Sequence, residues 1–133
     1  MRPERVAINT DGASRGNPGP AAIGATIRDG EGQLLARISQ HIGIATNNQA
    51  EYRAVITALQ EALKLGARIV DIRLDSELVV KQVNGRYRVR NAALRPLFQT
   101  VKQLTEQLEA FTITHVPRRQ NAEADRLANM ALR

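Results

Sequence analysis

The chain has 133 residues, a length that suits one domain with a sizeable core. It contains no cysteine, which excludes disulfides and thiolate metal sites, and no apolar run approaches the roughly 20 residues of a membrane span. A net charge of +6, from 19 Lys and Arg against 13 Asp and Glu, favours a polyanionic partner such as nucleic acid, although excess charge also serves solubility alone.

Three strands begin the predicted fold. Residues 4–11 alternate in polarity as a strand does, and residues 21–28 and 33–42 form two more strands joined by the hairpin sequence DGEG. The first strand stops at Asp11-Gly12, before a loop rich in glycine and proline. Asp-Gly is a common turn dipeptide, so a surface turn is one interpretation of this carboxylate and an active-site residue is the other.

The spacing of apolar residues then changes from two to three and four. This change predicts an amphipathic helix that begins near Asn48 and ends near Gly66. The remaining elements are predicted as a strand at 67–75, a short helix at 76–84, a basic loop at 84–91, a helix at 94–109, a strand at 111–116 and a last helix from Asn121. This order predicts one α/β domain over residues 1–133, with a mixed sheet covered by helices. The basic start MRPER leads into no signal-peptide core, so we expect a cytoplasmic protein.

Four acidic residues stand at the ends of predicted elements. Asp11 and Asp75 each end a strand that is predicted to be central and parallel, so both are expected at the carboxyl edge of the sheet, where ligand sites of α/β proteins form. Glu51 lies in the first turn of the long helix, and Asp125 lies in the second turn of the last helix. The predicted topology can bring all four together.

Each acid also has a purely structural interpretation. Asn48-x-x-Glu51 has the spacing of a capping box. Asp75 could cap the helix that begins at Ser76, and Asp125 could complement a helix dipole. Because all four acids lie where the topology can converge, a shared site explains them better than four separate structural roles.

Four stretches resemble the successive motifs of type 1 ribonuclease H, in family order: DGASRGNPGP, TNNQAEYRA, LDSELVV and NAEADRLAN. The resemblance covers nearly the whole chain. It implies a ribonuclease H-like fold, with a five-stranded mixed sheet whose strands 1 to 3 are antiparallel and which is flanked by helices. It also implies that the four catalytic, metal-binding carboxylates are Asp11, Glu51, Asp75 and Asp125.

The chemistry of carboxylates supports a metal site independently of the resemblance. Clustered carboxylates repel one another unless cations lie among them, and oxygen ligands without cysteine suit Mg²⁺ or Mn²⁺ rather than Zn²⁺. Two such ions about 4 Å apart can activate a water and stabilise the leaving oxygen of a phosphodiester. The resemblance implies hydrolysis of the RNA strand of an RNA–DNA hybrid, which leaves 5′-phosphate and 3′-hydroxyl ends.

The resemblance further assigns a role to each acid and to a set of substrate-binding residues. Asp11 would bridge both ions, Glu51 and Asp75 would hold the ion near the attacking water, and Asp125 would hold the other. Recognition of the RNA 2′-hydroxyl falls to a groove formed by Gly12, Ala13, Ser14, Asn17, Asn47 and Asn48, and Thr46 is expected at a DNA-strand phosphate. Loop and cap duties are the alternative for these residues, since Asn17 lies in a turn and Asn48 has the position of an N-cap.

The sequence departs from the family pattern in three places. Glu77 stands where many relatives carry Gln, and adds an acid near the substrate groove. The long basic protrusion of some relatives is replaced by a short loop in which Arg86, Arg88 and Arg90 either bind phosphate or are only solvated. The histidine of the family's last loop is absent from VPRRQN.

We therefore expect the scissile phosphate or the product to meet an arginine of this last loop. Arg118 is predicted as a catalytic residue and Arg119 as a substrate-binding residue, while His115 is interpreted as a partly packed strand residue. The predicted function is a Mg²⁺-dependent ribonuclease H that acts as a monomer on RNA–DNA hybrids, without a membrane or an obligate protein partner. The alternative is a catalytically silent nucleic-acid-binding module of the same fold, or the ribonuclease H half of a larger fusion enzyme.

Overall fold

The first three strands form an antiparallel meander. In the computed structural model, which describes residues 4–133, they are β1 (Arg5–Ser14), β2 (Gly19–Asp29) and β3 (Leu34–Ala45). The predicted hairpin between β2 and β3 is present, because the N–H of Gly32 donates a 3.0 Å hydrogen bond to the carbonyl of Asp29. These three strands supply three of the five strands of the sheet and one of its edges.

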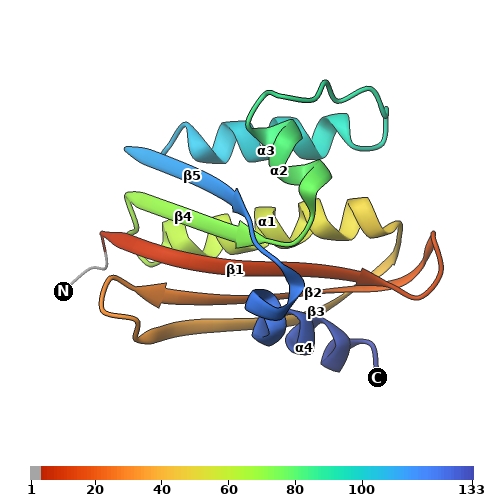
Figure 1. The fold of residues 1–133 in the computed structure, drawn as a ribbon, viewed down its shortest axis with the longest axis horizontal. Helices are drawn as coiled ribbons and strands as arrows, with labels where there is room; N and C mark the ends of the chain where they lie inside the picture. The colour runs from red at the N-terminus through yellow and green to blue at the C-terminus, as the bar shows by residue number, and fades with distance from the viewer. Residues whose placement is uncertain (1–3) are drawn as a thin grey trace.

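Two further strands run parallel to β1 on its other side. They are β4 (Ile69–Leu74) and β5 (Ala110–His115), and the strand order is β3-β2-β1-β4-β5 (Figure 1). This arrangement confirms the predicted five-stranded mixed sheet with antiparallel strands 1 to 3. Since β1 is central, it is covered on both faces and pairs with a strand along both of its edges.

Helices cover both faces of the sheet (Figure 1). On one face, α1 (Asn47–Lys64) packs on β1 and on α3 (Arg95–Thr105), and α2 (Glu77–Val83) precedes α3 in the connection from β4 to β5. On the other face, α4 (Ala122–Ala131) lies across β1, β2 and β3, after the short 3-10 turn η1 (Arg118–Asn121). No helix among residues 4–133 has the length and apolar character that a membrane span requires.

The main core lies between the sheet and α1. The apolar stripe of α1, spaced at three and four residues, faces β1 and β2, and its Val55 and Leu59 are fully buried. Among the largest fully buried side chains are Ile8, Ile27, Tyr52, Leu59, Ile72, Leu74 and Val101. The hydroxyl of Tyr52 donates a 2.6 Å hydrogen bond to Gln82, so the one phenol in this core has a partner. A rigid core therefore supports the central strands and α1.

The N-cap of the long helix lies two residues earlier than predicted. Thr46 is its N-cap, because the Thr46 hydroxyl accepts a hydrogen bond from the N–H of Gln49 at 3.1 Å and the Gln49 side chain accepts one from the N–H of Thr46 at 2.8 Å. The capping box predicted for Asn48 and Glu51 is therefore wrong. Asn48 and Glu51 are instead the second and fifth residues of the helix, and neither side chain has a capping role.

Two glycines allow helices to lie directly on the central strands. A Cβ at Gly12 would overlap the backbone of α1 at Ala50 and Glu51, and a Cβ at Gly24 would overlap the backbone of α4 at Ala124. Gly24 is the β2 partner of Asp11, whereas Gly12 follows Asp11 and faces the opposite side of the sheet. Both helices thus approach most closely beside Asp11.

The strand β1 continues past Asp11 and does not end there as predicted. It stays paired with β2 as far as Ser14, but its pairing with β4 stops at Asn9, which lies opposite Arg73. Asp11 therefore lies just beyond the end of its parallel neighbour, although not at the end of its own strand. Two smaller differences are that α3 stops at Thr105 and that η1 precedes the last helix.

Candidate active site

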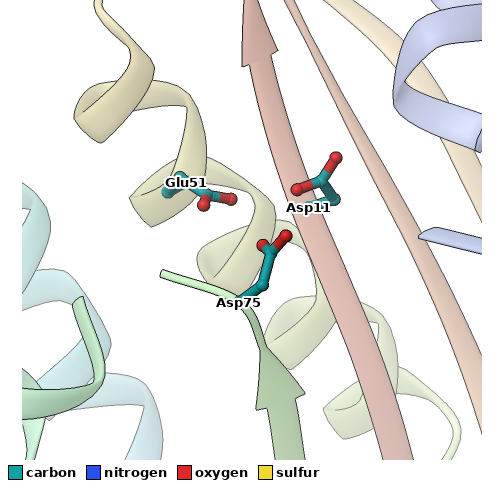
Figure 2. A group of neighbouring side chains, drawn as sticks. All are labelled: Asp11, Glu51 and Asp75. Carbon is teal, nitrogen blue, oxygen red and sulfur yellow. The ribbon is translucent and has the colours of Figure 1, made fainter. Parts of the chain in front are cut away.

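Three of the predicted acids meet at the carboxyl end of β4. Asp11 comes from β1, Glu51 from the first turns of α1, and Asp75 directly follows β4 (Figure 2). One oxygen of each carboxylate lies within 4.8 Å of the other two. The residues that the topology was expected to bring together are thus in contact range of a single ion.

Glu51 is fixed by the close approach of α1 to β1. The N–H of Gly12 donates a 2.6 Å hydrogen bond to Oε1 of Glu51, and this contact is possible because Gly12 has no side chain. Asp75 is not a helix cap, because the N-cap of α2 is Ser76, whose hydroxyl accepts a hydrogen bond from the N–H of Val79. The structural interpretations of both acids are therefore wrong.

The buried acids favour their protonated forms when no cation is present. Burial, followed by the negative charges of Glu51 and Asp75, raises the pKa of Asp11 from 3.8 to about 9. Burial also raises the pKa of Glu51 to about 8, against the opposing effect of the Gly12 hydrogen bond. Three carboxylate oxygens without nitrogen or sulfur ligands match the preference of hard divalent cations such as Mg²⁺ and Mn²⁺.

The fourth acid lies beside Asp11 but outside the group of three. Asp125 projects from the first turns of α4, and its charge contributes to the raised pKa of Asp11. Its carboxylate pairs with the guanidinium of Arg118 at 3.7 Å and with the amide of Asn129 at 3.3 Å. The helix-dipole interpretation of Asp125 is compatible with this position, which also lies within reach of a second ion next to Asp11.

A cleft of about 340 Å³ contains all four acids. It brings together most of the predicted substrate-binding residues and adds Ser76 and Asn129, which were not predicted. Its lining residues are Asp11, Gly12, Ala13, Ser14, Asn47, Asn48, Glu51, Asp75, Ser76, Arg118, Asp125 and Asn129. Asn129 lies one helical turn after Asp125, and this i, i+4 spacing could have indicated it.

The remaining predicted residues lie elsewhere. Asn17 and Thr46 line a neighbouring cavity of about 230 Å³, together with Asn48 and with Asn91, which was not predicted. Arg119 is exposed and lines neither cavity. The predicted binding residues thus divide between two adjoining hollows, and Asn48 belongs to both.

Hydrogen bonds join the loop after β1 to the start of α1. The side-chain oxygen of Asn17 accepts from the N–H of Asn47 at 3.0 Å, and that of Asn47 accepts from the N–H of Ser14 at 3.1 Å. The Ser14 hydroxyl donates to the carbonyls of Gly16 and Ala45. These residues therefore do perform loop duties, and the amide groups of Asn17 and Asn47 keep their N–H donors for a ligand.

Comparison with known proteins identifies the family. A family model described as reverse transcriptase-like matches residues 9–131. Ribonuclease HI of Halobacterium salinarum is 46% identical over 96% of this chain and 64% of its own length. The crystal structure of ribonuclease H1 from the same organism matches 96% of this chain and 97% of its own with a TM-score of 0.94. The chain belongs to the type 1 ribonuclease H family.

Two further relatives extend this family assignment. A bifunctional protein of Mycobacterium tuberculosis is 45% identical over 96% of this chain, but over only 35% of its own length. The chain thus spans less than two thirds of both curated relatives named here. LC11 ribonuclease H1, solved in complex with an RNA/DNA hybrid, is 41% identical and matches with a TM-score of 0.90 over 95% of each chain.

In this ribonuclease H family member, Glu77 and His115 lie together in a hollow outside the cleft of the acids. Glu77 does not line the cleft of the acids and pairs instead with Lys81, which lowers its pKa. His115 is exposed, so its predicted partial packing is wrong; it lies in a separate hollow of about 410 Å³ with Glu77 and Lys81. Its strand, β5, lies at the edge of the sheet.

Proposed function

We propose that this protein is a metal-dependent endoribonuclease that hydrolyses the RNA strand of RNA–DNA hybrids and leaves 5′-phosphate and 3′-hydroxyl ends. The observation that carries the proposal is the group of three carboxylates within 4.8 Å of one another, with Asp125 in the same cleft. The named ribonucleases among its relatives and the hybrid-bound structure of one of them support this choice of reaction. The described residues, with one sheet and one main core, would act as a single domain.

The acids would hold two Mg²⁺ ions, or Mn²⁺ as a substitute. Asp11 lies between the other acids and would contribute to both ion sites. Glu51 and Asp75 would complete one site, and Asp125 would complete the other. When bound, such a pair of ions supplies an activated water and stabilises the leaving oxygen. The raised pKa values of Asp11 and Glu51 support this role, because bound cations would offset the burial and the mutual repulsion that keep protons on these groups.

Recognition of the RNA strand would come from donors and acceptors beside the acids. The backbone of Gly12 and Ala13 and the amides of Asn47 and Asn48 line the same cleft. Glu51 has one carboxylate oxygen engaged by Gly12 and a second that can accept from a 2′-hydroxyl. A 2′-hydroxyl is both donor and acceptor, so a cleft that presents both kinds of group can distinguish RNA from DNA.

The neighbouring cavity would hold a phosphate of the DNA strand. Thr46 uses its hydroxyl oxygen as an acceptor in the helix cap, which leaves its O–H proton available to a phosphate oxygen. Asn17 and Asn48 supply amide N–H groups to the same cavity, and it contains no acidic side chain. Its distance from the acids along the surface would then set how the duplex lies across the protein.

Arg118 would contact the scissile phosphate or the departing product. Its side chain is 79% exposed and reaches Asp125 at 3.7 Å, so it can exchange this carboxylate for a phosphate with little rearrangement. Its guanidinium stays charged over the whole useful pH range. Arg119 would bind substrate from the same turn, although only Arg118 lines the cleft.

One assay tests the proposed reaction. Matched RNA–DNA, RNA–RNA and DNA–DNA duplexes are incubated with the protein, with and without Mg²⁺, and the ends of any products are mapped. We expect cleavage only in the RNA strand of the hybrid and only with metal. Binding of the hybrid without cleavage under any metal condition would instead identify a silent nucleic-acid-binding module.

A further inference from the structure

Beyond Asn9, the edge of β1 that faces β4 has no strand partner. Pairing with β4 stops at Asn9, whereas pairing with β2 continues to Ser14. Residues two apart in a strand present their polar groups to the same edge, so Thr10, Gly12 and Ser14 form one series. Along that edge, side chains of other elements make the hydrogen bonds that a neighbouring strand would otherwise make. Each of these side chains is therefore fixed against β1.

Two of these side chains come from α1 and one comes from the start of α4. Gly12 donates to Glu51 at 2.6 Å, and Ser14 donates to Asn47 at 3.1 Å. The carbonyl of Thr10 accepts a 2.8 Å hydrogen bond from Nδ2 of Asn121. Asn121 is thus the side chain that connects the segment bearing Asp125 to the strand bearing Asp11.

Asn121 is almost completely buried, with 1% of its surface exposed, and both polar atoms of its side-chain amide form a hydrogen bond. Its Oδ1 accepts a 3.0 Å hydrogen bond from Nδ2 of Asn9, and its Nδ2 donates a hydrogen bond to the carbonyl of Thr10. Although Asn121 is the N-cap of α4, its side chain makes no capping hydrogen bond. The side chain bonds to another element instead of its own helix, which distinguishes it from an ordinary cap.

The position of Asn121 in the helix determines where Asp125 lies. Residues four apart lie on the same face of a helix, about 6 Å apart along its axis. Asn121 is bonded to Thr10, and Asp125 is therefore one turn farther along the same face, next to Asp11. The partners of the Asp125 carboxylate, Arg118 and Asn129, belong to the same segment, so they move with α4 and do not fix its distance from β1.

We propose that Asn121 is a positioning residue, which fixes α4 on β1 and so holds Asp125 at the distance from Asp11 that a second divalent ion needs. This inference rests on the proposed metal-dependent function. The buried Asn121–Thr10 hydrogen bond holds α4 against β1 next to these two acids. Removal of the bond lets α4 shift outward and weakens the ion site that the two acids share.

The Asn121–Thr10 hydrogen bond is a tether of α4, that is, a hydrogen bond that ties this helix to a strand, and it has a matched control. The hydroxyl of Ser39 donates a 2.6 Å hydrogen bond to the carbonyl of Leu127, so it also ties α4 to the sheet, but at β3 and away from the acids. Ser39→Ala removes one tether of α4 without touching the edge of β1. Any effect common to both tethers is therefore a general effect of loosening the helix.

The test compares Asn121→Ala, Asn121→Asp, Asn9→Ala and Ser39→Ala with the parent protein. Thermal unfolding without metal, Mn²⁺ binding by titration calorimetry without substrate, and the Mg²⁺ dependence of hybrid cleavage are measured for each. We expect both Asn121 variants to bind Mn²⁺ at least about 10-fold more weakly and to need correspondingly more Mg²⁺, as found for residues that orient metal ligands. Asn9→Ala should weaken Mn²⁺ binding and raise the Mg²⁺ requirement in the same way but by a smaller factor. Ser39→Ala should lower the unfolding temperature by a similar amount but leave Mn²⁺ binding and the Mg²⁺ requirement unchanged.

Asn121→Asp decides between positioning and charge. The variant keeps an acceptor for Asn9 and nearly the same volume, but its carboxylate cannot donate to Thr10. An added negative charge should by itself strengthen cation binding, so weaker binding would follow only from impaired positioning. Mn²⁺ binding that is unchanged or stronger in folded Asn121→Asp would overturn the inference. If neither Asn121 variant folds, Mn²⁺ binding by Asn9→Ala that equals that of the parent protein would overturn it. A parent protein that binds Mn²⁺ but cleaves no hybrid would refute the proposed function alone.

Discussion

The backbone N–H of Gly12 donates a hydrogen bond of 2.6 Å to the carboxylate of Glu51, although the two residues are 39 positions apart. This contact joins the second turn of α1 to the strand that carries Asp11. It also separates two roles of Glu51, because the hydrogen bond needs only an oxygen acceptor whereas a metal ion needs the negative charge. A substitution that keeps the oxygen and removes the charge can therefore distinguish structure from catalysis.

Glu51→Gln is expected to abolish most of the cleavage while the fold is kept. The Gln side chain can still accept the hydrogen bond from Gly12. The substitution also removes a buried carboxylate, and with it a source of repulsion among the acids. We expect hybrid cleavage to fall by at least about 100-fold, which corresponds to about 2.7 kcal/mol of transition-state stabilisation. Steady-state cleavage and thermal unfolding of the metal-free protein check this, and normal activity would exclude Glu51 from the metal site.

Asp11→Asn is expected to stabilise the metal-free protein and to abolish its cleavage. In the folded state the pKa of Asp11 is raised to about 9 from an ordinary value of 3.8, so the folded protein holds a proton that the unfolded chain releases. The resulting stability is fully present below about pH 4 and is lost as the pH rises towards about 9. Asn has no such proton, so its advantage should grow with pH and reach at least about 1.4 kcal/mol, the equivalent of one pKa unit.

The pH dependence provides the control for this prediction. Free energies of unfolding without metal are measured at intervals between about pH 5 and about pH 9 for both proteins, so that other titrating groups cancel in the difference. Mg²⁺ should stabilise the parent protein more at the upper end of this range, because it binds the ionised carboxylates. A variant that is less stable than the parent throughout would contradict the repulsion on which the site assignment rests.

Arg118→Ala is expected to lower turnover more than His115→Ala does. Arg118 lines the cleft of the acids and pairs with Asp125, while His115 lies in a separate hollow with Glu77. We expect a decrease of about 10-fold in single-turnover or steady-state rate for Arg118→Ala, equal to about 1.4 kcal/mol, and a smaller decrease for Arg119→Ala. A dominant defect in His115→Ala, together with a step in the pH–rate profile that this variant removes, would reassign the role to the histidine.

Simultaneous replacement of Arg86, Arg88 and Arg90 by Ala is expected to weaken hybrid binding and its salt dependence. All three side chains are exposed, and the loop that carries them is held in place by the buried Val89 and by two backbone hydrogen bonds to the carbonyl of Lys81. For every phosphate that the variant no longer neutralises, the slope of log K against log salt should become shallower by about 1. Affinities measured at several salt concentrations give this slope.

A second triple variant with the same change of charge separates local contacts from net charge. It replaces three exposed basic residues far from the loop and the cleft: Arg37, Lys64 and Arg68. Its affinity should fall less, and its slope should stay closer to that of the parent protein. If the two triple variants are indistinguishable, the loop is only a solvated basic surface.

The sequence was sufficient to predict the elements and the acids, because both follow from local patterns. Alternation and the change of spacing near Asn48 depend on which residues face the core, and the structure confirms the resulting sheet. The capping box was assigned wrongly because two overlapping frames satisfy the same rule: Thr46-x-x-Gln49 and Asn48-x-x-Glu51. Only the contact of Glu51 with Gly12, which is distant in sequence, shows which frame the helix uses.

Other features of the site depend on tertiary contacts that no local pattern encodes. The last helix was correctly expected to start from Asn121, but the Asn121 side chain bonds to Thr10, 111 positions earlier. His115 follows the alternation of a packed strand, yet it is exposed because β5 lies at the edge of the sheet. Asn91 joins Asn17 and Thr46 through a loop whose path the sequence does not define.

The two glycines beside Asp11 also limit how this protein can diverge. Gly12 and Gly24 contribute no side chain to the chemistry, but any larger residue at either position would displace the backbone of α1 or α4. A selection for inactive variants after random mutagenesis should therefore recover these positions alongside the acids. The variants of the acids and of the glycines would lose activity for different reasons. Acid variants would accumulate as folded protein, whereas glycine variants would be removed by degradation. The substitutions that this site tolerates are therefore limited by close backbone packing as strictly as by the charge of the acids.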